Sequence, residues 1–156
     1  MKFQIKKYNS NYKSQIISVW EKSVIATHHF LSPKDYIEIK ALLQRYDFEV
    51  LDMFCLMDKD AVIGFIGLHN YKIEMLFLDP AYIGKGLGKQ LVQFAISKGG
   101  AKLVDVNEQN INAKGFYEKF GFQTYERTEK DDFGKNYPLL RMELREIGNL
   151  VSSKSE

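Results

Sequence analysis

The stretch from residue 73 to residue 92, IEMLFLDPAYIGKGLGKQLV, constrains the fold most, because three local patterns follow one another in it. Residues 73 to 78 are largely apolar, which predicts a mostly buried strand. Pro80 ends this strand, since proline has no N–H to donate to a β-ladder. After a glycine-rich segment, four apolar residues recur at the spacing of an amphipathic helix: Leu87, Leu91, Phe94 and Ala95.

Glycines alternate with larger residues between the predicted strand and the helix, at positions 84, 86 and 88. Glycine tolerates positive φ and leaves the backbone bare, so the N–H groups of such a loop can face an anion at the helix N-terminus. A dinucleotide-binding loop needs glycine where Leu91 stands, and a Walker loop needs glycine at Ile83 and Ser or Thr at Gln90. Two interpretations of the glycine segment remain: another type of phosphate-binding loop, or a turn without a ligand.

The composition fits one globular domain: 156 residues, of which 45% are hydrophobic. A net charge of +2 from 22 basic and 20 acidic residues does not predict a nucleic-acid partner. One cysteine excludes an internal disulfide, and no apolar run is long enough for a membrane span. The first ten residues lack the apolar core of a secretion signal, so we expect a cytoplasmic protein. Residues 146–156 are expected to be a loosely attached tail.

Hydrophobic periodicity predicts an α/β (α+β) chain of alternating strands and helices. Apolar alternation predicts strands at residues 2–8, 50–57, 61–69, 73–78, 103–106, 122–127 and 137–144. Helical spacing predicts one helix from about Ser10 to His28, and Ser32-Pro33 predicts the start of a second. A third helix follows the glycines and stops at Gly99-Gly100, and a fourth is capped by residues 107–110 and closed by Gly121.

Two segments of this pattern resemble the GNAT acetyltransferase superfamily. The glycine loop is similar to the family's pyrophosphate loop, although Ile83 stands where the family usually has Arg or Gln. The second similarity is to the pattern N-x-x-A-x-x-F-Y followed by G-F, and it is carried by Asn110, Ala113, Phe116, Tyr117, Gly121 and Phe122. The segments at 26–32, 106–110 and 131–140 are similar to small bacterial acetyltransferases of the YjaB type.

The resemblance implies a single-domain GNAT fold over residues 1–145, with acetyl-CoA as co-substrate. In that fold a mixed sheet of about seven strands is flanked by about four helices. The fourth and fifth strands, here 73–78 and 102–106, splay apart to receive the pantetheine arm. The implied coenzyme contacts are Leu76, Phe77, Leu78, Ile83, Gly84, Lys85, Gly86, Leu87, Gly88, Lys89, Asn110, Ala113, Phe116 and Tyr117.

Acetyl transfer to an amine needs an acid for the leaving thiolate and a base for the ammonium. Tyr117 matches the family's acid position, and a phenol with an ordinary pKa of about 10 is protonated at neutral pH. A core aromatic is the alternative. Glu74, on the strand that enters the cleft, is the candidate base, and an exposed glutamate at a strand edge is the alternative.

His28, His29 and Asn107 are predicted to bind the acceptor, and either histidine suits a base near neutral pH. Surface or capping roles are the alternative for the histidines, whose adjacent spacing does not predict a zinc site. Asp131 and Asp132 either attract a cationic acceptor or form a solvated turn.

Cys55 lies between Phe54 and Leu56, which predicts core packing and direct transfer without an acyl-cysteine. The function predicted first is therefore that of an acetyl-CoA-dependent N-acetyltransferase. It would act through a ternary complex on a small amine, a peptidyl lysine or an N-terminus. The alternatives are a sensor or pseudoenzyme that binds coenzyme A, and an α/β interaction domain. We expect a monomer or homodimer with no metal, nucleic-acid or membrane partner.

Overall fold

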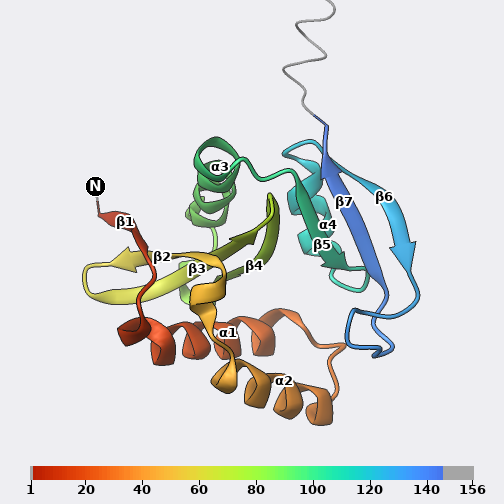
Figure 1. Ribbon diagram of the computed structural model, residues 1–156, viewed down its shortest axis with the longest axis horizontal. Helices are drawn as coiled ribbons and strands as arrows, with labels where there is room; N and C mark the ends of the chain where they lie inside the picture. Colours follow the sequence, from red (N-terminus) through yellow and green to blue (C-terminus); the bar gives the residue numbers. More distant parts are fainter. Residues whose placement is uncertain (1, 146–156) are drawn as a thin grey trace, which may run out of the picture. The chain divides into compact units, whose positions relative to one another are not determined.

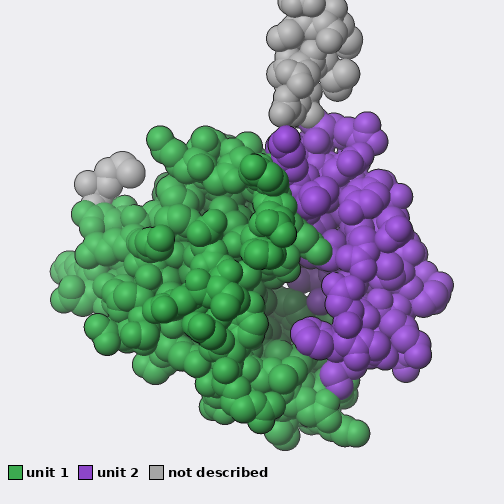
Figure 2. All heavy atoms as spheres, in the orientation of Figure 1, with its two compact units in different colours: residues 1–101 green, residues 102–156 purple. Residues whose placement is uncertain are grey.

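The computed structural model describes residues 2–145, and Figure 1 shows how their elements follow one another. This part of the chain contains seven β-strands, four α-helices and three short 3-10 segments. Figure 2 shows its two compact units in different colours: the first ends at Ala101, and the second begins at Lys102. The tail expected at 146–156 lies outside the described residues, so the domain boundary at residue 145 stays a prediction.

An antiparallel sheet of four strands forms the centre of the first unit, in the order β1-β2-β3-β4. These strands are β1 (Phe3–Lys7), β2 (Asp52–Asp58), β3 (Ala61–His69) and β4 (Lys72–Leu78). β1 is the edge strand of this sheet, with Ile5 opposite Leu56 of β2. The turn between β2 and β3 needs a left-handed residue, and Lys59 takes that conformation with a φ of 55°.

Helices cover both faces of this four-stranded sheet (Figure 1). They are α1 (Lys13–Thr27) and α2 (Pro33–Arg45) on one side and α3 (Leu87–Gly99) on the other. α1 and α3 each pack on β3 and β4, whereas α2 packs on α1, where the Tyr36 ring stacks 5.6 Å from that of Trp20. As predicted, Ser32 caps α2: its Oγ accepts a hydrogen bond of 3.1 Å from Asp35 N.

One core cluster of the first unit lies between α1 and the sheet. α1 contributes a buried stripe to it: Ile16, Val19, Trp20 and Val24. β2 and β3 contribute Met53, Cys55, Met57, Val62 and Phe65. Because each fully buried apolar side chain of this size stabilises the folded state by about 1.5–3 kcal/mol, this face fixes α1 on the sheet. Cys55 is fully buried, which confirms the prediction of core packing.

The second unit has three antiparallel strands and one helix. The strands are β5 (Leu103–Asn107), β6 (Phe122–Thr128) and β7 (Leu139–Leu144), and β7 pairs with both of the others. The helix α4 (Ile111–Glu118) packs on β5 and β6. Gly121 has a φ of 102° after this helix, as the sequence predicts for a residue that redirects the chain into β6.

Three predicted boundaries are wrong by a few residues. The strand predicted from residue 50 begins at Asp52, because Phe48–Val50 form a 3-10 turn capped by the Asp47 side chain. The last strand begins at Leu139 rather than residue 137, directly after Pro138, which has no N–H for the ladder. The first helix begins with a 3-10 turn at Ser10–Tyr12 before α1.

Candidate functional site

The glycine loop connects β4 to α3. Asp79 follows the strand, and its Oδ1 accepts a hydrogen bond of 3.0 Å from Ala81 N, which fixes the 3-10 turn Pro80–Tyr82. Gly84 and Gly86 then have φ angles of 88° and 74°, which are left-handed values that favour glycine. A Cβ atom added to either glycine would meet nothing within 4 Å. The prediction of bare backbone at positive φ is thus confirmed for two of the three glycines.

The N-terminus of α3 opens directly out of this loop. Gly86 is the N-cap residue, so no side chain caps the helix. The N–H of Gln90 donates a hydrogen bond of 3.1 Å to the carbonyl of Gly86. This bond begins the i→i−4 hydrogen bonds of α3, and the amides of the residues just before Gln90 lie outside that pattern. Lys85 and Lys89 are both exposed on either side of the cap. Donors, cations and the positive end of the helix dipole therefore coincide here, which suits an anion.

β4 carries the predicted contacts Leu76, Phe77 and Leu78, all of which are half-buried. It pairs with β3 along one edge, with Ile66 opposite Leu76 and Gly64 opposite Leu78. In the strand order of the sheet, β3 and β5 are the two neighbours of β4.

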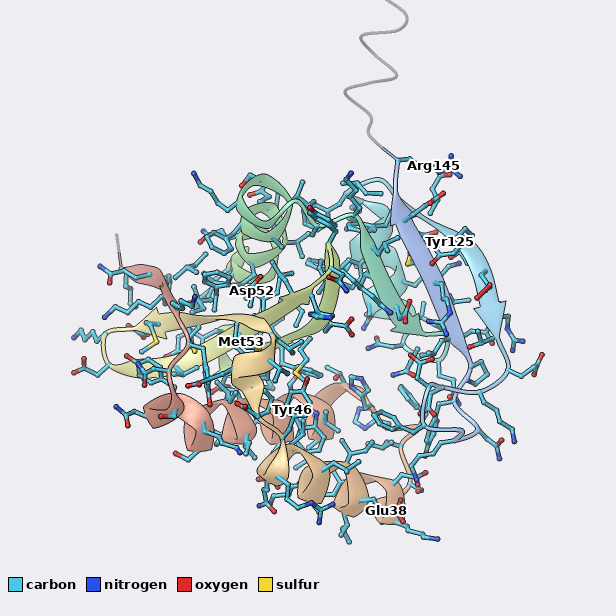
Figure 3. The ribbon with its side chains drawn as sticks, viewed as in Figure 1. Glu38, Tyr46, Asp52, Met53, Tyr125 and Arg145 are labelled. Atoms are coloured by element: carbon cyan, nitrogen blue, oxygen red, sulfur yellow. The ribbon has the colours of Figure 1, made fainter. Side chains whose placement is uncertain are left out.

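Glu74 lies at a β-bulge that the sequence analysis did not identify. Met75 is opposite Gly67 and Ile73 is opposite Leu68, so Glu74 is the extra residue of β4. Glu74 is exposed, and after the effect of burial its charge raises the pKa of Tyr46. Figure 3 shows Tyr46 where the chain leaves α2. A glycine inside a strand often marks a bulge, so Gly67 was the available signal.

His28 is the C-cap residue of α1, and its N–H donates a hydrogen bond of 2.8 Å to the carbonyl of Val24. Its ring packs on Phe30 and Phe77, with centroid separations of 5.2 and 6.4 Å. Burial, and secondarily the charge of His29, lower the pKa of His28 below its ordinary value of 6.5. The helix end at His28 is as predicted, while His29 is exposed.

In the second unit, Asn110 begins α4, as predicted. Its Oδ1 accepts a hydrogen bond of 3.1 Å from Ala113 N, so the side chain is an N-cap whether or not it also contacts a ligand. The backbone N–H of Asn110 donates 2.9 Å to the carbonyl of Asn107, which closes the turn after β5. Asn107, Ala113 and Phe116 are half-buried.

The Tyr117 ring is buried in the second unit, at an exposed fraction of 6%. It lies edge-on to Phe116 and Phe122, with centroids 5.1 and 5.6 Å away. Within residues 2–145 no hydrogen bond of its hydroxyl is found. Burial raises the pKa of the Tyr117 phenol, which keeps it protonated.

A network around Arg141 also escaped the sequence analysis. Arg141 Nη1 lies 2.7 Å from Asp105, Nε lies 3.1 Å from Glu126, and Nη2 lies 2.9 Å from Asp132. Asp132 makes this ion pair while its side chain stays 63% exposed. No spacing in the sequence links these four positions, since cross-strand neighbours depend on register.

Other chemistry has little support in the described residues. Residues 2–145 contain no cluster of three or more His, Cys, Asp or Glu side chains that could hold a metal ion. In the same range no helix is both long and apolar enough to cross a membrane. Burial raises the pKa of the Cys55 thiol to about 12, so it is not a reactive thiolate.

The predicted site residues divide between the two compact units. The first contains the glycine loop, residues 76–78, Glu74 and the two histidines. The second contains Asn107, Asn110, Ala113, Phe116 and Tyr117. The first group includes the uncapped start of α3, and the second includes a protonated phenol.

Comparison with known proteins gives the class of this chain. Residues 12–145 match the family model of the acetyltransferase (GNAT) domain. The peptidyl-lysine N-acetyltransferase YjaB of Salmonella typhimurium is 37% identical over 142 residues, which cover 91% of this chain and 98% of that protein. The solution structure of apo YjaB from Escherichia coli has a TM-score of 0.84 at 35% identity, and covers 92% of this chain and 97% of its own.

A more distant structure shares the fold alone. The PaiA N-acetyltransferase of Thermoplasma acidophilum, solved in complex with coenzyme A, has a TM-score of 0.68 at 24% identity. The match covers 93% of this chain and 99% of that one.

This chain belongs to the GNAT acetyltransferase family. It is an acetyl-CoA-dependent N-acetyltransferase, as the sequence predicted. The predicted GNAT fold, an α+β chain with seven strands in a mixed sheet and four helices, is confirmed as well.

Proposed function

We propose that this protein transfers the acetyl group of acetyl-CoA to the ε-amine of a peptidyl lysine. The acceptor class is supported by the Salmonella relative, a peptidyl-lysine N-acetyltransferase that matches nearly the whole chain. A small amine or a protein N-terminus is the alternative acceptor. A cytoplasmic location and a monomeric or homodimeric state stay predictions.

The observation that carries the proposal is the uncapped start of α3. Its two left-handed glycines and its free first-turn amides support a diphosphate held by residues 83–89. The pantetheine arm then follows the edge of β4 at Leu76 to Leu78, and an amide of the same strand stabilises the tetrahedral oxyanion. Asn110, Ala113 and Phe116 complete the coenzyme contacts from α4.

Transfer is direct in this proposal, because the Cys55 thiol is buried and protonated. The amine nitrogen forms a bond to the thioester carbon while acetyl-CoA and the acceptor are both bound. The C–S bond then breaks, and the leaving sulfur takes a proton from the Tyr117 hydroxyl. His28, His29 and Asn107 bind the acceptor, and Glu74 is the base that the sequence suggests.

One experiment separates this enzyme from a sensor on the same fold. Thiol release from acetyl-CoA is followed with a lysine peptide, with the same peptide acetylated at its N-terminus, and with free lysine. We expect release with both peptides, mass addition on the lysine side chain and binding of coenzyme A by calorimetry. Binding without release to any amine would identify a sensor or pseudoenzyme, and no binding would refute the coenzyme site.

A further inference from the structure

Deprotonation of the acceptor ammonium requires a base, because the neutral amine is rare at neutral pH. A lysine-like amine with a pKa of about 10.4 is only about 0.04% neutral at pH 7. Making it neutral costs about 4.6 kcal/mol, and the most effective base has a pKa near the working pH. A carboxylate with an ordinary pKa of about 4.3 is a weak proton acceptor by this criterion, whereas a neutral imidazole is suitable.

The hydrogen bonds of Thr27 fix which nitrogen of His28 carries the proton. Thr27 Oγ1 lies 2.7 Å from the carbonyl oxygen of Ser23, and only the hydroxyl can supply a hydrogen to that contact. The same Oγ1 lies 2.7 Å from His28 Nδ1. Because the hydroxyl hydrogen is already used, the ring must donate from Nδ1. Neutral His28 therefore has its lone pair on Nε2.

The His28 ring packs against β4, the strand at which we place the coenzyme. His28 packs on Phe77, and Phe77 in turn packs on Phe65 with centroids 5.5 Å apart, so the imidazole is fixed against β4. Phe77 is the middle residue of the strand segment at which we place the pantetheine arm. The ring is half-buried, and it contacts the strand through the side chain of Phe77.

Burial is the main cause that lowers the pKa of His28, and the charge of the exposed His29 adds to it. The charged residues of β4 are Lys72 and Glu74, and the first turn of α2 has Lys34 and Asp35. Within the described chain, His29 is the one charged group that contributes to this shift.

We propose that His28, held by Thr27 as the Nδ1–H tautomer, is the catalytic base that takes a proton from the acceptor ammonium at Nε2. This inference rests on the proposed function. His28 becomes an imidazolium, and the freed nitrogen lone pair forms the C–N bond. As the C–S bond breaks, its electron pair goes to sulfur, which is protonated by Tyr117. The surplus proton of the new amide and that of His28 leave to water, and Tyr117 is reprotonated from water.

The main test is the pH dependence of kcat/KM with the lysine peptide. In the wild type we expect activity to fall as the pH decreases below 6.5, because His28 must be neutral to act. His28→Gln should lower kcat/KM by about 100-fold or more and remove this acidic limb, while coenzyme affinity is kept. His69→Gln is the control, since His69 is exposed at the end of β3.

Thr27 is a positioning residue, and its variants test the tautomer. Thr27→Val should lower kcat/KM by about tenfold and shift the acidic limb, because the Nδ1–H loses its acceptor. Thr27→Ser restores the hydroxyl and should restore both. Thr128→Val is the matched control, since Thr128 Oγ1 also donates 2.7 Å to a backbone carbonyl, that of Lys130, in the second unit. Long-range 15N NMR of the wild type should show Nδ1 protonated and Nε2 bare.

The outcomes separate this inference from the proposed function. A wild type that releases thiol, together with a folded His28→Gln variant of equal activity and unchanged pH profile, overturns the inference alone. The same holds if His29→Gln, and not His28→Gln, removes the acidic limb, or if NMR finds Nε2 protonated. A wild type that binds acetyl-CoA but acetylates no amine overturns both.

Discussion

The two helices that carry the family's sequence patterns begin in opposite ways. α3 begins at Gly86, in a left-handed conformation and without a side-chain cap. α4 begins at Asn110, whose side chain accepts a hydrogen bond from Ala113 N. The first helix leaves its N-terminal amides for a ligand, whereas the second satisfies one of its own.

This difference assigns different kinds of chemistry to the two regions. In our proposal the backbone of the glycine loop binds the diphosphate, so the conformation of the loop matters more than its side chains. The proposed contribution of α4 to turnover is instead a side chain, Tyr117. Coenzyme affinity and turnover should therefore be separable by mutation.

The largest expected effect is on turnover. Tyr117→Phe removes the hydroxyl and keeps the buried ring, so kcat should fall by about 100-fold or more while the Kd of coenzyme A changes less than twofold. Steady-state kinetics and calorimetry measure the two quantities. Tyr125→Phe, at an exposed tyrosine of β6, is the control and should change neither. Unchanged kcat in the Tyr117 variant would show that Tyr117 is only a core aromatic.

The next effect is on coenzyme affinity. Gly86→Ala places a Cβ at a φ of 74°, which costs an L-residue about 1–2 kcal/mol and shifts the loop. We expect the Kd of coenzyme A to rise about tenfold, with a similar loss in the free energy of unfolding.

Gly134→Ala is the matched control for this loop. Gly134 has a φ of 78° and the same open space around its Cβ, but it lies in the turn before β7. It should lose similar stability in a denaturant titration and bind coenzyme A normally. Equal losses of affinity in both variants would mean that general destabilisation, and not the loop, determines binding.

Asn110 allows its cap and its predicted coenzyme contact to be separated. Asn110→Ala removes both and should lower the free energy of unfolding by about 1 kcal/mol. Asn110→Ser keeps a capping oxygen and should be nearly as stable as the wild type. If the amide contacts coenzyme, both variants should bind about two- to fivefold more weakly. If Asn110→Ser binds coenzyme A with normal affinity, Asn110 acts only as the N-cap of α4.

The smallest effect concerns the residue that departs from the family pattern. Ile83 is 59% exposed, so its replacement does not disturb the core. Ile83→Gln restores a polar side chain beside the loop and should tighten coenzyme binding about two- to fivefold through one added hydrogen bond. Ile37→Gln, at an isoleucine of α2 that is 65% exposed, is the control for added polarity. Unchanged affinity would show that the main-chain amides suffice.

Local patterns predicted most of the fold. Ser32-Pro33 identified the start of α2, and Gly84 and Gly86 identified the left-handed loop between β4 and α3. Errors occurred at strand boundaries and at irregular pairing. The Asp47 cap moved the start of β2, and the bulge opposite Gly67 was not predicted.

The sequence by itself determined the element order, the family and the residues available for chemistry, because propensity, capping and glycine conformation act over a few neighbouring positions. Only the tertiary structure decided which nitrogen of His28 is bare, because the Thr27 hydroxyl meets the Ser23 carbonyl only after α1 has formed, and the His28 ring beside it is held by packing on Phe77. The same is true of Arg141 and its three carboxylates, which strand register brings together from distant positions.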